Sequence, residues 1–452
     1  MSAGGGIGCN LVRCIWQNAL SQKGSQMLPR VMIYGPQFDS YSGSGITLSC
    51  LFGRWPRTQL CMLASSPETR ESMQRVLGFY YVGQDARWRW PWASVGTKSG
   101  AIAVSAVEED AVLSSRATRL QTLRGMVNSA IERKAWRVTD SMLQWARSSS
   151  PEVVYVQVGS PVTCRFALDL IRVLELPLVV HQMDDWLWSD DGAEKRSNAE
   201  RRRSDEEFAT LINLAGGRLA ISEGMAREYE KRYGGMWEVF HNGIDVRAWS
   251  STRDQGSRRN VQFRLRYGGR VGWGIGSSLI LCARAVESLR KEGLDIWLDV
   301  YSSDWTGRVC RQLAAIQGIT VSAPVPSDEL RPSMEMASAQ LIAYDFDQNT
   351  KGRGGLSMPT KLSECLASRR PIFIVAPSEL TLCAEAVGGG WAHVVSKPSV
   401  DEIARGLRRL AMDADYCQDL VARAWSECLR NHSAASTQQR FSAVLSRTAS
   451  GQ

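Results

Sequence analysis

Short runs of β-branched and apolar residues alternate along the chain with longer segments of helical spacing. In the first half these runs fall at residues 30–34, 59–64, 153–158, 176–181, 218–221 and 237–240. In the second half they fall at 263–267, 296–301, 341–344, 371–375 and 393–395. Strands that alternate with helices predict parallel sheets built from strand-helix-strand units. The fold class is therefore α/β.

The pattern runs twice, which predicts two α/β domains. Residues 250–260, SSTRDQGSRRN, are polar and charged without apolar periodicity, as a linker would be. We expect a loose N-terminal extension at 1–29, a first domain at 30–249, this linker, a second domain at 261–430 and a C-terminal helix and tail at 431–452. A helix should begin after Ser399, because Glu402 follows at the spacing of a capping box.

Composition limits the class of protein. The chain has 452 residues, of which 44% are hydrophobic and 22% charged, as in globular proteins of two or three domains. No apolar run approaches the roughly 20 residues that cross a bilayer, and the first residues lack the layout of a signal peptide. The 11 cysteines are scattered and odd in number, which favours a reducing cytoplasm.

The formal net charge of +8 fits nucleic acid, anionic lipid or an anionic small substrate. We expect no nucleic-acid partner, because no aromatic and basic residues interleave as in RNA-binding motifs. In the basic segment 112–147, Arg116 and Lys134 share a helical sector with leucines. This pattern has two interpretations: peripheral contact with the cytoplasmic membrane face, or a structural helix with snorkelling arginines.

The most informative stretch is SMPTKLSECLA, from Ser357 to Ala367. It predicts a helix whose first turns carry Lys361 and Glu364, after a glycine-rich loop. A helix N-terminus favours anions, so a phosphate would bind there beside the lysine. Glu364, one turn further on, would accept hydrogen bonds from sugar hydroxyls, and phosphate beside ribose suggests a nucleotide. The alternative is an ordinary capped helix with a solvated ion pair.

Two other glycine-rich turns follow predicted strands. Gly43 and Gly45 lie in the first turn, before a helix expected near Ile46, and the alternative here is simply a tight turn. The second, GGRVGWGIGSS, carries Arg270, whose guanidinium could hold a diphosphate together with backbone amides. Its spacing does not fit the dinucleotide-binding fingerprint, and Asp299 lies inside the next predicted strand.

His181, Asp184 and Asp185 follow an apolar strand, at the end where doubly wound sheets bind ligands. His181 could donate a hydrogen bond to a substrate hydroxyl or carry a proton, since its unperturbed pKa is about 6.5. The alternatives are a core histidine satisfied by neighbouring backbone and aspartates that cap the next helix. We expect no metal, because no histidine or cysteine lies at ligand spacing.

Together these segments resemble the retaining glycosyltransferases of family 4, which have the GT-B fold. The matching pieces are SGSGITLS, LPLVVHQMDDW, ISEGMAREYEKRYG with HNGID, YGGRVG and SMPTKLSECLASRRPIFI, in the family's order over about residues 30 to 430. The resemblance implies two Rossmann-like domains facing across a cleft, with a C-terminal helix that crosses back to the first domain. It implies metal-independent transfer, without a cofactor, from a nucleotide-diphosphate sugar to a glycan, a lipid-linked or a small-molecule acceptor, as in polysaccharide biosynthesis.

The resemblance also implies roles for single residues. Lys361 and Arg270 would face the donor phosphates, Glu364 the ribose and His181 the transferred sugar, so His181, Arg270 and Lys361 are the catalytic candidates. The donor-binding candidates are Gly45, Arg270, Ser357, Thr360, Lys361 and Glu364. The candidates for the acceptor or the cleft are Gly43, Asp184 and Asp185.

The chain departs from the family pattern twice. Leu356 stands where many members have a second glutamate, and Ile275 and Gly276 stand where members often have a lysine. Phosphate neutralisation would then rest on Lys361, Arg270 and helix dipoles, with Arg353 nearby. Two alternatives to transfer follow: a catalytically silent scaffold or binding protein of the same fold, and a nucleotide-sugar epimerase of similar fold.

Overall fold

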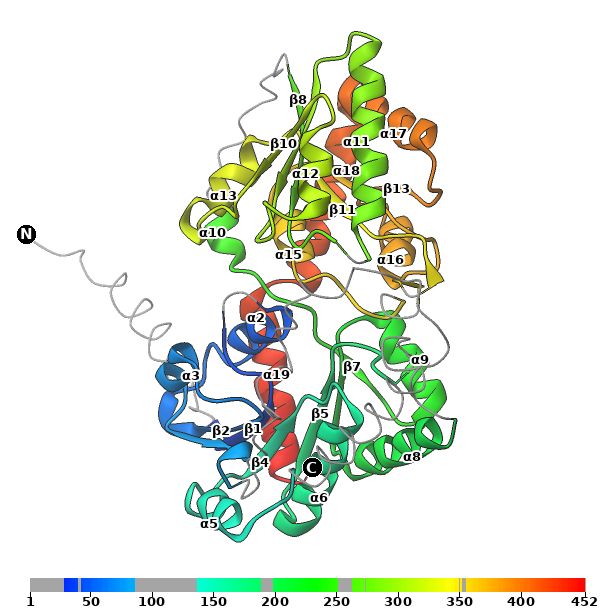
Figure 1. The fold of residues 1–452 in the computed structure, drawn as a ribbon. Coiled ribbons are helices and arrows are strands. Elements are labelled where there is room, and N and C mark those ends of the chain that lie inside the picture. The colour runs from blue at the N-terminus through cyan, green and yellow to red at the C-terminus, as the bar shows by residue number, and fades with distance from the viewer. Residues whose placement is uncertain are drawn as a thin grey trace, which may run out of the picture.

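Two parallel sheets organise the chain (Figure 1). The computed structural model describes residues 28–39, 42–85, 136–187, 198–250, 262–272, 274–348, 350–351 and 355–451. The first sheet has seven strands in the order β3-β2-β1-β4-β5-β6-β7. Their bounds are β1 (Val31–Gly35), β2 (Leu60–Ala64), β3 (Gly78–Tyr81), β4 (Val153–Val156), β5 (Leu178–Gln182), β6 (Gly217–Ala220) and β7 (Glu238–Val239).

The second sheet has six strands in the order β10-β9-β8-β11-β12-β13. Their bounds are β8 (Phe263–Gly268), β9 (Ile296–Tyr301), β10 (Ile319–Ser322), β11 (Ala339–Ala343), β12 (Ile372–Val375) and β13 (His393–Val395). Every pairing in both sheets is parallel, which confirms the predicted α/β class.

Helices connect the strands and cover both sheets. In the first half they are α2 (Gly43–Leu51), α3 (Arg70–Arg75), α5 (Asp140–Ser148), α6 (Pro161–Leu174), α8 (Asn198–Leu214), α9 (Glu223–Tyr233) and α10 (Val246–Ser250). In the second half they are α11 (Gly276–Lys291), α12 (Arg308–Ala314), α13 (Ser327–Met336), α15 (Leu362–Ala367), α16 (Thr381–Gly389), α17 (Val400–Met412), α18 (Ala414–Asn431) and α19 (Ala434–Ala449). No helix in these described ranges is long and apolar enough to span a membrane.

Side-chain caps explain where several helices begin. Ser399 accepts a hydrogen bond from the Glu402 amide at the start of α17, as predicted. Ser42 caps α2 in the same way, so this helix begins at Gly43 rather than near Ile46. At α6, Ser160 and Thr163 form a reciprocal capping box and Pro161 takes the first helical position, where no amide partner is needed.

All eleven predicted strands overlap observed ones, but β3 and β10 were not predicted. Each is a four-residue strand at the edge of its sheet. Only one residue of each is buried, so neither shows the continuous apolar run of a central strand. The basic segment near Arg116 and Lys134, the N-terminal extension up to residue 27, linker residues 251–260 and Arg353 lie outside the described residues.

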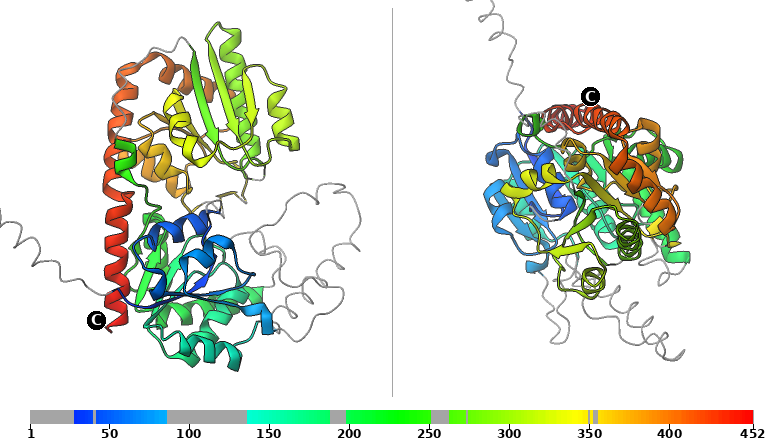
Figure 2. Two further views of the ribbon diagram at one scale, coloured as in Figure 1. Left: turned by 90° about the vertical axis from the view of Figure 1, so that its left-hand side faces the viewer. Right: turned by 90° about the horizontal axis from the view of Figure 1, so that it is seen from above.

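The last helix returns to the first sheet. Phe441, Val444 and Leu445 of α19 are fully buried in the same core cluster as Val179 of β5 and Leu219 of β6. Figure 2 shows α19 as the long red helix that runs beside the N-terminal half. The C-terminal helix therefore crosses back to the first domain, as the resemblance implied.

Candidate functional site

Lys361 lies at the carboxyl end of β8, directly before α15. Its Nζ donates to the carbonyl of Gly268 at 3.3 Å and lies 3.9 Å from the centre of the Tyr267 ring. A side chain on Gly269 would lie 3.5 Å from the same Nζ. The structure thus brings Lys361 beside the glycine-rich turn that carries Arg270.

Glu364 follows on the first turn of α15, as predicted. Burial lowers the pKa of Lys361 to about 8, against the opposing effect of Cys365 and Glu364. Burial also raises the pKa of Glu364, while Arg266 and Lys361 lower it. The three charged groups therefore share one poorly solvated region at the edge of the second sheet.

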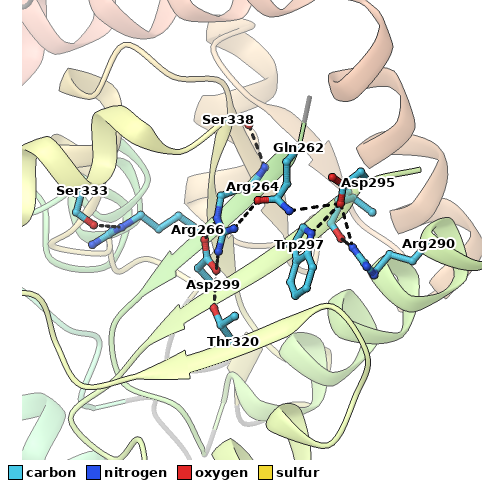
Figure 3. Close-up of polar contacts among 11 residues, drawn as sticks. Gln262, Arg264, Arg266, Arg290, Asp295, Trp297, Asp299, Thr320, Ser333 and Ser338 are labelled. Atoms are coloured by element: carbon cyan, nitrogen blue, oxygen red, sulfur yellow. Dashed lines mark hydrogen bonds and ion pairs between the residues drawn. The ribbon is translucent and has the colours of Figure 1, made fainter. Parts of the chain in front are cut away.

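Arg266, the third charge of this region, was not predicted from the sequence. It is a buried residue of β8, its Nε donates to Ser333 Oγ of α13 at 3.1 Å (Figure 3), and its guanidinium lies 4.6 Å from the centre of the Tyr301 ring. Burial lowers its pKa, and the charge of Glu364 is among the effects that raise it. One feature of the sequence could have identified Arg266: it is an arginine between two apolar residues of a predicted central strand.

Arg264 and Asp299 form a separate contact within the same sheet. Arg264 of β8 binds Asp299 of β9 through two hydrogen bonds, of 2.8 and 2.7 Å, and Thr320 of β10 also binds Asp299 (Figure 3). Asp299 therefore ties three neighbouring strands together. This contact agrees with the prediction that Asp299 is not the acidic residue of a dinucleotide-binding motif.

Arg270 is exposed on the glycine-rich turn. Its carbonyl accepts a hydrogen bond of 2.5 Å from the Tyr267 hydroxyl, and its charge lowers the pKa of Tyr344 against the larger effect of burial. The amides at the start of the following helix, α11, are already used: Asp345 accepts from the Ser278 amide at 2.7 Å. A diphosphate could reach the Ser278 amide only by displacing this carboxylate, and its binding by Arg270 with the other amides of the turn stays a prediction.

His181 is fully buried on β5. Its Nδ1 lies 2.7 Å from the Tyr155 hydroxyl, which also accepts from Gln157 at 2.6 Å, and its Nε2 has no hydrogen-bond partner among the described residues. Burial lowers the pKa of His181 to about 3, so the ring is neutral at neutral pH. Hydrogen-bond donation fits this buried, neutral ring better than the proton-carrier interpretation, and both stay predictions.

The two aspartates after β5 have different surroundings. Asp185 is buried and accepts from the Tyr229 hydroxyl at 2.8 Å and from Arg232 at 3.1 and 3.2 Å, which joins the end of β5 to α9. Asp184 is exposed and accepts from Ser357 Oγ at 2.9 Å. Asp184 therefore contacts the loop before Lys361, while Asp185 binds two residues of its own domain.

Gly43 and Gly45 lie at the start of α2. A side chain on Gly43 would lie 2.9 Å from Thr360 Cγ2, so the turn after β1 also contacts the loop before Lys361. A side chain on Gly45 would lie 2.4 Å from the Asp39 carboxyl carbon, so a carboxylate already fills the space beside Gly45. Residues that follow strands of the first sheet thus contact residues that follow β11, and the carboxyl ends of the two sheets face each other.

No group of three or more histidine, cysteine or acidic side chains with the geometry to hold a metal ion occurs among the described residues. Two features therefore lie where the two sheets face each other. One is the charged region around Lys361, and the other is the set of contacts with the loop before it.

Comparisons with known proteins support the fold. No family model and no curated protein matches the chain. HepE from Anabaena, solved with UDP and glucose, matches with a TM-score of 0.60 at 10% identity over 92% of this chain and 99% of its own. An α,α-trehalose 6-phosphate synthase from Burkholderia multivorans matches with a TM-score of 0.61 at 11% identity, over 94% and 100%. A glycosyltransferase from Rickettsia africae matches with a TM-score of 0.61 at 9% identity, over 93% and 99%. The chain has the GT-B fold that these glycosyltransferases share.

Proposed function

We propose that the protein is a glycosyltransferase that moves a sugar from a nucleotide-diphosphate sugar to an acceptor. The observation that carries the proposal is the region formed by Arg266, Lys361 and Glu364 at the carboxyl end of β8, the end where parallel sheets bind ligands. The similarity to HepE, which was solved with UDP and with UDP-glucose, makes uridine nucleotides the first donors to test.

Lys361 and Arg270 would face the donor diphosphate. When the nucleoside diphosphate leaves, negative charge builds up on its phosphate oxygens, and cations placed in advance stabilise that transition state. Glu364 would accept hydrogen bonds from the ribose hydroxyls, and Ser357 and Thr360 would line the same donor side. Retention of configuration and independence of metal belong to the proposal through the resemblance to family 4.

The transferred sugar would lie toward the first sheet. The neutral His181 ring has an unpartnered Nε2 among the described residues, and we assign it a hydrogen bond to a sugar hydroxyl. We place the acceptor, a glycan, a lipid-linked or a small molecule, in the first domain near Gly43 and Asp184. Cytoplasmic location, and membrane contact near Arg116, stay predictions from the sequence.

Leu356 favours a second candidate, a protein that binds the donor without transferring its sugar. The side chain of Leu356 packs against the core where many family members have a carboxylate that contacts the sugar. Product analysis separates the candidates: a transferase releases nucleoside diphosphate, an epimerase returns an altered nucleotide-sugar, and a silent scaffold leaves the donor unchanged.

The test is turnover of UDP-, GDP- and ADP-sugars by the purified full chain. We expect release of one nucleoside diphosphate, and we expect Lys361→Ala to cost about 2 to 4 kcal/mol of transition-state stabilisation, as does loss of other charge-stabilising groups. Lys397→Ala is the matched control, because Lys397 is exposed beyond β13. Equal turnover by Lys361→Ala, Arg270→Ala and the wild type would overturn the assignment.

A further inference from the structure

The loop of residues 355–360, immediately before Lys361, contacts both domains. Ser222, which follows β6, donates to the carbonyl of Leu356 at 2.6 Å. Ser357 donates to Asp184, which follows β5, at 2.9 Å. The loop belongs to the second domain by sequence, yet two neighbouring strands of the first sheet supply hydrogen-bond partners for it.

The hydroxyl of Ser222 both accepts and donates a hydrogen bond. Its oxygen accepts from the Met225 amide at 3.0 Å and so caps α9, while its proton goes to Leu356. The residue is fully buried, so this hydroxyl has no access to solvent. The Leu356 carbonyl thus lies at the positive end of α9, which favours its partial negative charge.

Close packing holds both ends of the loop. At the beginning, the backbone amide and hydroxyl of Thr381 both donate to the Gly355 carbonyl at 2.8 Å. The same threonine lies against the first turn of α9, where a side chain on Gly224 would come within 2.2 Å of its Oγ1. At the other end, Thr360 lies against Gly43. The loop is therefore enclosed by elements of both domains.

We propose that this loop is a latch that positions Lys361 when the two domains are closed, with Ser222 and Asp184 as its positioning residues. Separation of the domains would break both hydrogen bonds, because each joins one domain to the other. The loop would then keep the hydrogen bonds that Thr381 donates to Gly355 at its beginning. The latch itself stands on these contacts, and only its effect on donor binding rests on the proposed function.

Paired variants separate the latch from general packing. Ser222→Asp keeps an oxygen that caps α9 but has no proton to donate to Leu356 at neutral pH, whereas Ser222→Thr keeps both functions. Asp184→Ala removes the acceptor of Ser357, whereas Asp184→Asn keeps an acceptor oxygen. Ser148→Ala is the control, because Ser148 is an exposed residue of α5.

Hydrogen–deuterium exchange of the full chain, read on a peptide that covers 355–367, tests the latch without any substrate. We expect Ser222→Asp and Asp184→Ala to speed exchange there about fivefold, the effect of one lost hydrogen bond. Ser222→Thr, Asp184→Asn and Ser148→Ala should exchange like the wild type. Unchanged exchange in both Ser222→Asp and Asp184→Ala would overturn the latch.

Donor kinetics separate failure of the latch from failure of the proposed function. We expect KM for the donor to rise about fivefold in Ser222→Asp and Asp184→Ala, with a smaller change in kcat, and to be restored in Ser222→Thr and Asp184→Asn. Faster exchange in a protein that turns over no donor would support the latch and overturn the proposed function. Turnover with a wild-type KM in every variant would overturn the latch and leave the function standing.

Discussion

Lys361 combines a full charge with a half-buried position between the Tyr267 ring and the Gly268 carbonyl. Water solvates an ammonium better than these neighbours do, and burial therefore lowers its pKa to about 8. The charge is thus present at neutral pH and is lost as the pH rises. The same poorly solvated surroundings strengthen its attraction to a phosphate.

This pKa predicts how activity depends on pH. We expect kcat/KM for the donor to fall as pH rises through about 8, because kcat/KM reports the ionisation of the free enzyme and only the charged lysine attracts the diphosphate. The measurement is kcat/KM between about pH 6.5 and 9.5. In Lys361→Arg, kcat/KM should not fall within this pH range, because a guanidinium keeps its charge. A flat wild-type profile up to about pH 9.5 would contradict the role of Lys361.

The residues of the charged region differ in how far they could be predicted from the sequence. Lys361 and Glu364 could be predicted because they lie three residues apart at the start of one helix, where spacing alone brings side chains together. Arg266 could not, since it lies 98 residues earlier in the chain, and only the folded structure brings its charge near Glu364. The position of His181 at a strand end was visible, but burial and the contact with Tyr155 were not, and these determine its protonation.

The turn after β7 crosses the connection between α18 and α19. Ile244 and Ser433 form a parallel bridge, and the His241 and His432 rings stack with centres 4.8 Å apart. A side chain on Gly243 would lie 2.8 Å from both the Ala434 backbone and Cys50 Sγ. The chain passes between the domains at this turn and again between α18 and α19. These two segments pack directly on each other, and Gly243 lies where they are closest.

Gly243→Ala should destabilise this crossing. Two neighbours, one of them backbone, must move to admit the methyl group, which corresponds to about 1 to 3 kcal/mol of overpacking. Gly388→Ala on α16 is the control. The added methyl group would meet no described residue within 4 Å, so this variant should be neutral or more stable by up to about 1 kcal/mol. Urea unfolding measures both, and equal stability of the two variants would refute the packing argument.

Strands could be predicted where burial requires a continuous run of apolar residues. The central strands are buried on both faces and could be identified from their apolar runs, whereas the edge strands β3 and β10 could not. The glycine-rich turn before α11 shows a different limit. Its glycines suggested open amides, but Asp345, which follows another strand, already binds the Ser278 amide.

At the scale of the whole molecule, the chain's last helix completes the core of its first domain. Phe441 is fully buried, with ring centres 5.0 Å from Phe52, 5.5 Å from Tyr155 and 5.8 Å from Phe240. Periodicity predicted helices near the C-terminus but not which sheet they cover. The return to the first domain was available only through the family resemblance, because it depends on contacts between distant parts of the chain.

Phe441→Ala tests this dependence. We expect a loss of about 3 to 5 kcal/mol in the free energy of unfolding, because a buried aromatic side chain leaves a cavity lined by other rings. Leu429→Ala on α18 is the control, since Leu429 is 47% exposed and should change stability by less than about 1 kcal/mol. Denaturant unfolding of both variants is the measurement. A loss below about 1 kcal/mol in Phe441→Ala would contradict the packing of α19 on the first sheet.

Calorimetric titration of the purified full chain with UDP, GDP and ADP tests the donor site most directly. We expect at least one of them to bind the wild type, Lys361→Ala to bind it at least about tenfold more weakly, and Lys397→Ala to bind it like the wild type. If none of the three binds, or if Lys361→Ala binds as tightly as the wild type, the region around Arg266, Lys361 and Glu364 is not a nucleotide-sugar site.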